Sequence, residues 1–206
     1  MDRMINGGLT AGDETAEGYS LSKDPIIRAD ELKLIDYARA HPAVVYRVLE
    51  DSAARHDRIA AAWIAGYTPK GKDQITALLG AVNDPDSTVR NNSIRVLAVL
   101  AEHDLNLARQ IPAESFIPML NSLTWTDRNK AMFVLEPITA GRDPKTLESL
   151  RREATDALRQ MSQWTYWGHA SKALTLLGRV NGIPEDRLQD LIKTRNATAI
   201  FNAAAR

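Results

Sequence analysis

The histidines of this chain, which could do acid–base or metal chemistry, are few and scattered. The four histidines occur singly, at His41, His56, His103 and His169. His56 and His103 each precede an aspartate, but adjacent side chains diverge on a helix, whereas ligands on one helix face are spaced three or four residues apart. The spacing favours solvated or capping histidines, and we expect no metal site.

Charged clusters such as Glu148 with Arg152 and Glu153 with Asp156 contain the carboxylates that general acid–base catalysis needs. Their spacing is also the ordinary spacing of salt bridges on an exposed helix face. The chain has no cysteine, no phosphate-binding glycine loop, and neither a GxSxG nor an HExxH motif. We therefore expect that the chain is not an enzyme and that it uses no cofactor.

A group of aromatic residues is the more specific signal for binding. Trp125 and Trp164 share a sequence context, since each is followed by a threonine and, six residues on, by an alanine. The shared context places them in equivalent turns of adjacent helix pairs, where they can stack along one edge. Such an edge is either a hot-spot strip for a peptide or partner protein, or a structural cover over the junction between pairs. Trp167, beside Tyr166, is open to both interpretations.

A second candidate surface consists of polar residues on the second helix of each expected pair. The set is mildly basic and rich in amides: Arg55, Arg58, Asn91, Asn92, Arg95, Asn129, Lys130, His169 and Lys172. One interpretation is a groove for an acidic peptide or a nucleic-acid backbone. The other is a solvated helix face, where Arg and Lys are simply good helix formers. For the set as a whole we expect an interaction groove.

The elements that position these residues are clearest between Lys72 and Glu102. Two apolar stripes at helical spacing flank the stretch Asn83–Ser87, where Pro85 disfavours helix at Asp84 and the Asp and Ser residues favour turns and N-caps. The first stripe is Ile75, Leu78, Leu79 and Val82, and the second is Val89, Ile94, Leu97, Leu100 and Ala101. Neither helix can bury its apolar face alone, which is typical of a repeat.

Further helices are expected on both sides of this pair. Asp24-Pro25 and His41-Pro42 read as helix starts, Arg55–Tyr67 as a second helix, and Ile111-Pro112 as the start of another pair. Later helices are expected from Asp127 to Thr139, Pro144 to Trp164, Tyr166 to Val180 and from Ile183-Pro184. Residues expected on buried faces include Leu32, Tyr37, Val44, Phe116, Ile117, Leu120 and Leu123. Superposing second helices gives steps of 35, 38 and 39 residues, which fit an α-solenoid and exclude a heptad bundle.

The central pair resembles the HEAT-repeat family. The motif is Leu78-Leu79, then Asn83-Asp84-Pro85-Asp86, then Val89-Arg90 and Leu97. The resemblance covers roughly residues 42–194 and weakens outside 72–102, where Asp127 replaces the Val before Arg128 and Tyr166-Trp167 replaces the Val-Arg pair. It implies a scaffold or binding surface, with second helices on the concave face, and a ladder of Arg90 and Arg128 to neighbouring Asp residues that lapses at Trp167.

The expected fold is therefore all-α, an α-α superhelix (HEAT-like solenoid) of about four to five antiparallel helix pairs. We expect an irregular arm at 1–24, which either packs through Met4, Ile5, Leu9, Tyr19 and Leu21 or is disordered, a helical repeat domain at 25–195, and a frayed tail at 196–206. The charge balances at 26 basic and 26 acidic residues, so no bulk attraction to nucleic acid or membrane is expected. No apolar run is long enough to span a membrane and no signal peptide is evident, which leaves a cytoplasmic protein or the mature part of an exported precursor.

The expected function is a non-catalytic protein-interaction or scaffold module that binds a protein or peptide partner through the concave face. A second class is nucleic-acid binding or base repair, since alkylpurine DNA glycosylases have a HEAT-like fold; it would need a tryptophan and an aspartate poised over a flipped base, and Trp125 and Asp127 are the residues present. A third class, the HEAT-like lyases that attach bilins, has no marker in this sequence.

Overall fold

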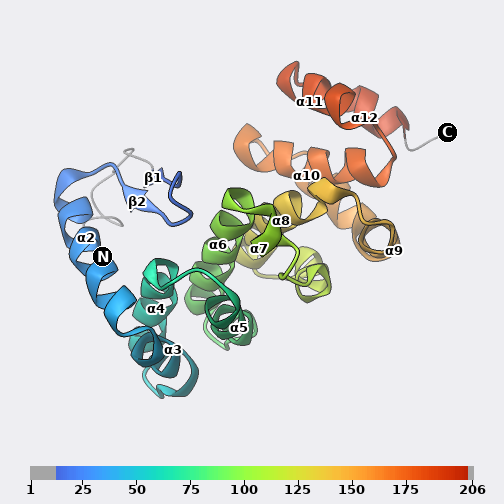
Figure 1. The fold of residues 1–206 in the computed structure, drawn as a ribbon. Coiled ribbons are helices and arrows are strands. Elements are labelled where there is room, and N and C mark those ends of the chain that lie inside the picture. Colours follow the sequence, from blue (N-terminus) through green and yellow to red (C-terminus); the bar gives the residue numbers. More distant parts are fainter. Residues whose placement is uncertain (1–12, 204–206) are drawn as a thin grey trace. The chain divides into compact units, whose positions relative to one another are not determined.

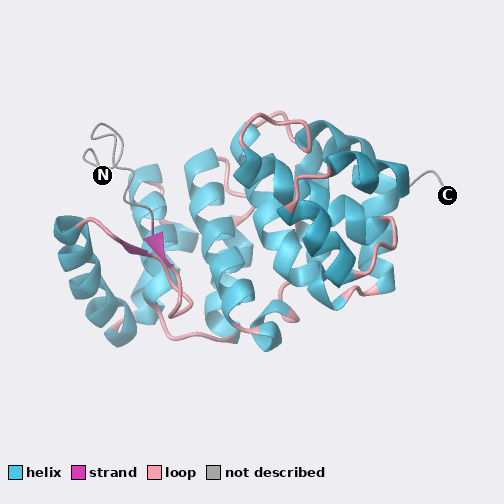
Figure 2. Ribbon diagram, turned by 90° about the horizontal axis from the view of Figure 1, so that it is seen from above, coloured by secondary structure: helices cyan, strands magenta, loops and turns pink. Residues whose placement is uncertain are grey.

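The structure of the chain, a computed structural model, describes residues 13–203. This part is helical apart from two short strands, and it divides into two compact units, Met1–Gln110 and Ile111–Arg206. Figure 2 shows how fully helices dominate both units. The all-helical prediction is confirmed, while the expected domain at 25–195 is divided between the two units. No helix in residues 13–203 is both long and apolar enough to cross a bilayer.

Unit 1 begins with a small hairpin and continues as helices. Its elements are β1 (Asp13–Glu14), β2 (Leu21–Ser22), α2 (Pro25–Ala40), α3 (Pro42–Asp51), α4 (Arg55–Ile64), the 3₁₀ turn η1 (Ala65–Tyr67), α5 (Lys72–Ala81), α6 (Ser87–His103) and α7 (Leu105–Ala108). The strands pair antiparallel, with Asp13 opposite Ser22 and Glu14 opposite Leu21. Figure 1 shows β1 and β2 in blue near α2.

Two helix pairs form the body of unit 1. α3 packs on α4 and α5 on α6, while α3 also contacts α5 and α4 contacts α6. First helices are therefore neighbours of first helices, and second helices of second helices. Buried side chains from both pairs, including Ala62 from the first and Leu78, Ile94 and Leu97 from the second, are fully shielded from solvent.

The helix starts follow the expected local chemistry. The Asp24 carboxylate accepts hydrogen bonds from the backbone amides of Ile26 and Ile27, and the Asp86 carboxylate accepts them from Thr88 and Val89. These bonds satisfy amides that have no partner within the helix. The turn before α6 is thus the Asp-Pro-Asp element that the sequence predicts.

Unit 2 has the same kind of pairing with a less regular first element. Its elements are the 3₁₀ turns η2 (Ala113–Ser115) and η3 (Pro118–Asn121), then α8 (Trp125–Ile138), η4 (Thr139–Gly141), α9 (Pro144–Met161), α10 (Trp167–Val180), α11 (Glu185–Lys193) and α12 (Ala197–Ala203). η3 packs on α8 and α9 on α10, while η3 also contacts α9 and α8 contacts α10. α11 and α12 pack on α10.

The prediction of a helix after Ile111-Pro112 is wrong. Pro118 falls inside it, and a proline in a helix interior lacks the amide for the hydrogen bond and clashes with the preceding turn, so the segment forms two 3₁₀ turns instead. Phe116, Ile117 and Leu120 are nevertheless buried as expected, whereas Leu123 is fully exposed.

Other expectations need smaller corrections. Leu32, Tyr37 and Val44 were expected to face the core but are between two-fifths and a half exposed, because Ile35, Ala38 and Val45 take the buried positions on those helices. The expected frayed tail instead forms α12, which buries Ile200 against its neighbours. In the arm, Tyr19 and Leu21 do pack, while Met4, Ile5 and Leu9 lie outside the described residues.

A recurring arginine defines the register of the second helices better than the sequence alignment does. Arg58, Arg90 and Arg128 each lie four residues after the N-cap of α4, α6 and α8, and each donates to carbonyl oxygens of the turn before its own helix. The N-caps at 54, 86, 124 and 166 differ by 32, 38 and 42 residues. The predicted steps of 35 and 39 are therefore wrong, and the arginine lapses at Ala170 rather than at Trp167.

Candidate binding surfaces

The polar residues expected to line a groove in unit 1 are mostly engaged within the unit. Arg58 makes two hydrogen bonds to the Asp84 carboxylate, at 2.7 and 3.1 Å, and Asn92 is buried, donating to the carbonyl oxygen of Ile59 at 3.2 Å. Exposed Arg55 lies 3.6 Å from the Asp86 carboxylate, and half-buried Asn91 donates to the side chain of Asn92. Arg58 and Asn92 thus join the two helix pairs, Arg55 lies beside the second pair, and Asn91 contacts Asn92 on its own helix.

Arg95 has a different environment, because residues 13–22 lie over it. Its guanidinium pairs with the Asp13 carboxylate, donates to the Ser20 hydroxyl at 3.4 Å and lies 5.0 Å from the centre of the Trp63 ring. Burial lowers the pKa of Arg95 from its usual value. The hairpin thus covers the predicted binding residue with a carboxylate of its own chain.

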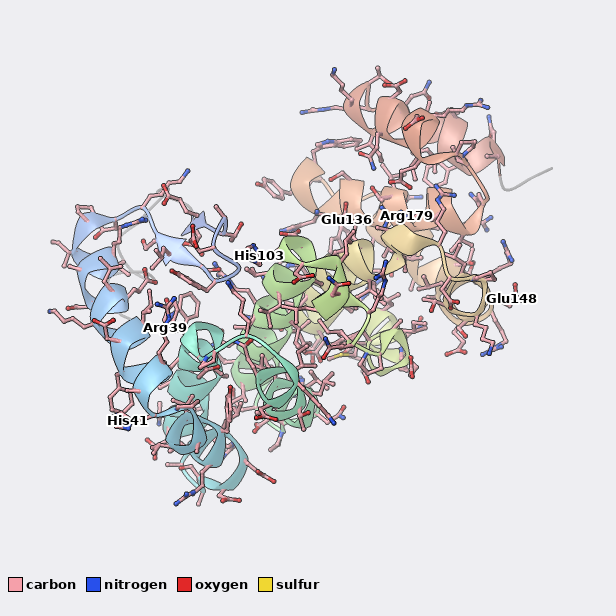
Figure 3. All side chains as sticks on the ribbon, in the orientation of Figure 1. Arg39, His41, His103, Glu136, Glu148 and Arg179 are labelled. Atoms are coloured by element: carbon pink, nitrogen blue, oxygen red, sulfur yellow. The ribbon has the colours of Figure 1, made fainter. Side chains whose placement is uncertain are left out.

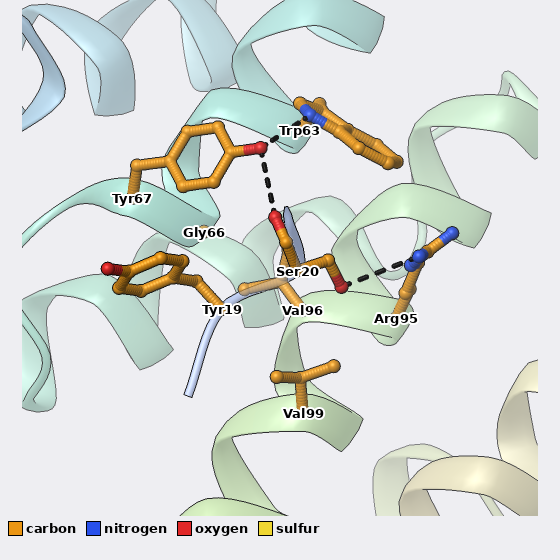
Figure 4. Close-up of a pocket in the computed structure, with 8 residues that line it drawn as sticks. All are labelled: Tyr19, Ser20, Trp63, Gly66, Tyr67, Arg95, Val96 and Val99. Carbon is orange, nitrogen blue, oxygen red and sulfur yellow. Dashed lines mark hydrogen bonds between the residues drawn. The ribbon is translucent and has the colours of Figure 1, made fainter. Parts of the chain in front are cut away.

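The rest of the hairpin is held by a compact set of contacts, drawn in Figure 4. The Tyr67 hydroxyl donates to the carbonyl oxygen of Ser20 and accepts from the Trp63 indole, both at 3.1 Å. Burial and the charge of Glu31 raise the pKa of Tyr67, which keeps this hydroxyl protonated. The Tyr19 ring packs edge-on against Tyr67 at 5.7 Å. Only about 20 Å³ stays empty between the hairpin and α6, room for about one water molecule.

In unit 2 the expected aromatic residues do come together. Trp125 and Trp164 have ring centres 5.7 Å apart, and His169 lies 5.4 Å from Trp125, 5.9 Å from Phe133, 6.2 Å from Trp164 and 4.7 Å from Tyr166. We call these five residues the aromatic patch. Trp125 is 50% and Tyr166 66% exposed, so the patch presents large apolar side chains to solvent.

Helix geometry explains how the patch forms. Trp125 and Phe133 are eight residues apart on α8, close to two turns, while Trp164 and Tyr166 precede α10 and His169 lies in its first turn. Packing of α8 on α10 brings the two sets together. Gly168 leaves room for Tyr166, because a Cβ atom there would lie 2.6 Å from its ring. Relative to the N-caps, Trp125 corresponds to Trp167 and not to Trp164, so the predicted equivalence is wrong although the predicted contact forms.

Cationic side chains surround the aromatic patch. The Arg128 guanidinium lies 5.7 Å from the Trp164 ring centre, and the ammonium groups of Lys130 and Lys172 lie 5.3 and 5.4 Å from that of Phe133. Lys172 also pairs with Glu136. Burial, and then the charge of Lys130, lowers the pKa of His169. The lower pKa favours the neutral form of His169, which serves the patch as an aromatic ring.

Two predicted residues of unit 2 lie apart from the patch. Asn129 is buried, and Trp167 packs instead with Arg195, whose guanidinium lies 5.2 Å from the indole ring. The sequence interpretation did not single out Phe133 for the patch, and it considered Arg128 only as a ladder residue. Their spacing from Trp125 on α8 was the available signal.

The residues considered for catalysis make hydrogen bonds or ion pairs with neighbouring side chains. Asp127 is buried and accepts a hydrogen bond from the Ser122 hydroxyl at 3.0 Å, so its carboxylate is engaged in the turn before α8. The carboxylates of Glu148, Glu153 and Asp156 pair with neighbouring arginines on the surface of α9. Across residues 13–203, no three His, Asp or Glu side chains gather closely enough to hold a metal ion.

A buried arginine network stabilises the end of α8 in the same unit. Arg179 on α10 donates to the Glu136 carbonyl oxygen and, at 2.9 Å, to the Thr139 hydroxyl, and it pairs with Glu185. Figure 3 shows Arg179 and Glu136 side by side. The bond to Glu136 satisfies one of the last carbonyl oxygens of α8, which ends at Ile138 and has no further α-helical turn to supply amides there.

Comparison with known proteins gives a likeness of fold alone. No family model matches the chain, and no curated protein matches it in sequence. Among solved structures it is similar to an engineered protein from the Northeast Structural Genomics Consortium, with a TM-score of 0.58 and 16% identity over 88% of this chain and 90% of that one.

Proposed function

We propose that this chain is a non-catalytic binding module with a HEAT-like solenoid fold, and that the aromatic patch of unit 2 is a main contact for a partner protein. The repeat interpretation is supported by the neighbour relations inside each unit and by the arginine that recurs four residues after three N-caps. The expected concave groove does not need to be continuous for this function, because unit 2 carries the patch by itself.

One observation carries the proposal: Trp125 and Tyr166 are at least half exposed while touching a preassembled aromatic cluster. Tryptophan and tyrosine dominate hot spots because they bury much area at little conformational cost. Packing against Trp164 and His169 holds the rings in place before a partner arrives, which lowers the entropic cost of binding. Arg128 and Lys130 at the rim favour a partner segment that carries carboxylates.

The test compares partner capture by the wild type, by a Trp125→Ala/Tyr166→Ser double variant and by a Leu123→Ser control. Leu123 lies two residues before Trp125 and is fully exposed, so its loss removes apolar surface without touching the patch. A partner retained by the wild type and control, identified by mass spectrometry, is then purified and titrated by calorimetry. We expect the double variant to lose at least about tenfold in affinity. Equal affinity for all three proteins, at unchanged Tm, would reject the patch as the contact.

A second candidate function is binding of single-stranded nucleic acid at the same patch. The observation that favours it is the pairing of Trp125 and Trp164 with Arg128 over the Trp164 ring, since stacking rings beside cations are how non-specific single-strand sites work. Labelled single-stranded and duplex DNA, titrated at low and then rising salt, distinguish the two. Phosphate binding weakens steeply with salt and is lost in Trp125→Ala/Lys130→Ala. No binding at low salt removes this candidate.

A further inference from the structure

The hairpin of residues 13–22 holds to unit 1 in the way that a bound peptide holds to its receptor. Much of its binding goes through the main chain: Tyr67 donates to the Ser20 carbonyl oxygen, the Ser22 amide donates to the Glu31 carboxylate at 2.7 Å, and Arg28 donates to the Ser22 carbonyl oxygen at 3.4 Å. Main-chain hydrogen bonds with a few side-chain anchors are the usual recognition mode for extended segments.

The side-chain anchors of the hairpin are of two kinds. Leu21 is buried with Ile35 and Ala38 and belongs to the core of the unit. Asp13, on the neighbouring strand β1 and opposite Ser22, makes an ion pair with Arg95, whose side chain keeps 30% of its surface exposed. Residues 14–17, which follow Asp13 in the chain, are exposed. The hairpin therefore has a firmly packed strand, β2, at Leu21 and a polar, partly exposed strand, β1, at Asp13.

The surface beneath Asp13 is suited to binding a carboxylate. Arg95 lies over the Trp63 ring, which fixes the plane of its guanidinium, and Val96 and Val99 supply apolar walls. Gly66 allows α6 to approach closely, since a Cβ atom there would lie 3.1 Å from Val96. An arginine held on an aromatic ring beside apolar walls binds a carboxylate with little reorganisation.

We propose that the Arg95–Trp63 surface of unit 1 recognises an extended acidic segment of a partner protein, and that residues 13–18 occupy this surface as a displaceable internal copy of that segment. The Asp13 carboxylate shows the chemistry of the residue that enters, and the pairing of β1 with β2 shows where its backbone lies. Leu21 keeps β2 attached when β1 is released.

Competition with the internal segment sets the expected affinities. A tethered segment acts at a millimolar effective concentration, so a peptide in solution must compete against it. Removing the Asp13 carboxylate weakens the internal segment while the receptor residues stay intact. The wild type is therefore expected to bind an acidic peptide weakly, and an Asp13→Ala variant to bind the same peptide at least about tenfold more tightly.

The experiment titrates a fluorescent peptide with the sequence of residues 13–22 against the full chain, read by fluorescence anisotropy. The proteins are the wild type, Asp13→Ala, Asp13→Ala/Arg95→Gln, and an Asp30→Ala control that removes an exposed carboxylate paired with Lys33. A second peptide carries asparagine at the first position. We expect tight binding only when the peptide that keeps aspartate at its first position meets Asp13→Ala. The double variant should lose this binding, and the control should bind as the wild type does.

Three results would overturn the proposal: no peptide binding to Asp13→Ala at unchanged Tm, equal binding to Asp13→Ala and wild type, or binding that survives Arg95→Gln. Hydrogen exchange gives a second readout, because the Gly18 amide donates to the Thr15 carbonyl oxygen and should lose protection in the wild type when the acidic peptide is added at saturation. Unchanged protection with bound peptide would also contradict displacement. Trp125→Ala/Tyr166→Ser should bind the peptide as its parent does, so failure here and failure of the aromatic patch are separate results.

Discussion

The Arg58 guanidinium donates two hydrogen bonds to the Asp84 carboxylate, Nε to Oδ2 at 2.7 Å and Nη2 to Oδ1 at 3.1 Å. Arg58 lies on α4 and Asp84 in the turn between α5 and α6, so this contact joins the two helix pairs of unit 1. Burial raises the pKa of Asp84, but hydrogen bonds from Arg58 and from the Asp86 amide outweigh it and hold the pKa below its ordinary value.

We expect Arg58→Lys to destabilise the protein, because an ammonium group keeps the charge but cannot make both hydrogen bonds. The Tm in a thermal scan is expected to fall by about 5 °C. The matched control is Arg55→Lys on the same helix, whose 3.6 Å pair with Asp86 is largely exposed and contributes little. Equal Tm values for the two variants would show that the two-bond geometry does not matter.

The local part of this structure was predictable from the sequence. Asp24, Asp86 and Asp143 cap helices because a short acidic side chain reaches the free amides of the first turn, and Pro25, Pro42 and Pro144 each begin a helix. The contact between Trp125 and Trp164 was also predictable, since Trp125 begins one second helix and Trp164 lies in the turn before the next. These features depend on residues close in sequence or on the repeat.

What the sequence could not show depends on contacts across the chain. Asp13 and Arg95 are 82 residues apart, and nothing near either one indicates their pairing. Arg58 and Arg95 look like equal members of a basic helix face, yet the one joins helix pairs and the other lies beneath a hairpin. Leu123 has the spacing of a core residue, but Pro118 ends the helix that would have buried it.

Close packing between α10 and α11 gives a second prediction. A Cβ atom at Gly178 would collide with the side chain of Leu188, which is fully buried. We expect Gly178→Ala to lower the free energy of unfolding by about 1–2 kcal/mol, since overpacking exceeds the gain in helix propensity. Urea unfolding followed by circular dichroism measures the change.

The control for this prediction is Gly80→Ala on α5. Gly80 is exposed and a Cβ atom there would meet nothing within 4 Å, so only the helix propensity changes. We expect this variant to gain about 0.5–1 kcal/mol. A gain of similar size for Gly178→Ala would mean that α10 and α11 are less closely packed than the contact with Leu188 indicates.

The lowered pKa of Glu185 predicts that the stability of the protein depends on pH in the acidic range. Hydrogen bonds from Arg179 and Arg142 outweigh the effect of burial and lower the pKa of Glu185 from 4.5 to about 2. A carboxylate whose pKa is lower in the folded state adds stability above its unfolded pKa, and this stability is lost as pH falls toward the folded value. The contribution of Glu185 is thus full above about pH 5 and declines toward pH 2.

Urea unfolding at several pH values between 5.5 and 3 tests this in the wild type and in Glu185→Gln. The variant should be less stable at pH 5.5, and its difference from the wild type should shrink as the pH falls. Glu148→Gln is the control, because Glu148 pairs with Arg151 on an exposed face of α9 and contributes little. A difference that stays constant with pH would contradict the role of the Glu185 charge.

The last prediction concerns the pKa of His169 in the aromatic patch. Burial, and then the positive charge of Lys130, lowers the pKa of this imidazole below 6.5. Because the folded state binds fewer protons than the unfolded state between the two pKa values, the contribution of His169 to stability is full above about pH 6.5 and falls as the pH drops to the folded value.

The midpoint of the His169 ring proton in an NMR titration should lie below 6.5, and Lys130→Gln should raise it. Protonation puts a cation among the rings, beside Arg128 and Lys130, so partner binding at the patch should change over the same pH range and not over a higher one. A midpoint at or above 6.5, or one unmoved by Lys130→Gln, would contradict the lowering of the His169 pKa by burial and by the charge of Lys130.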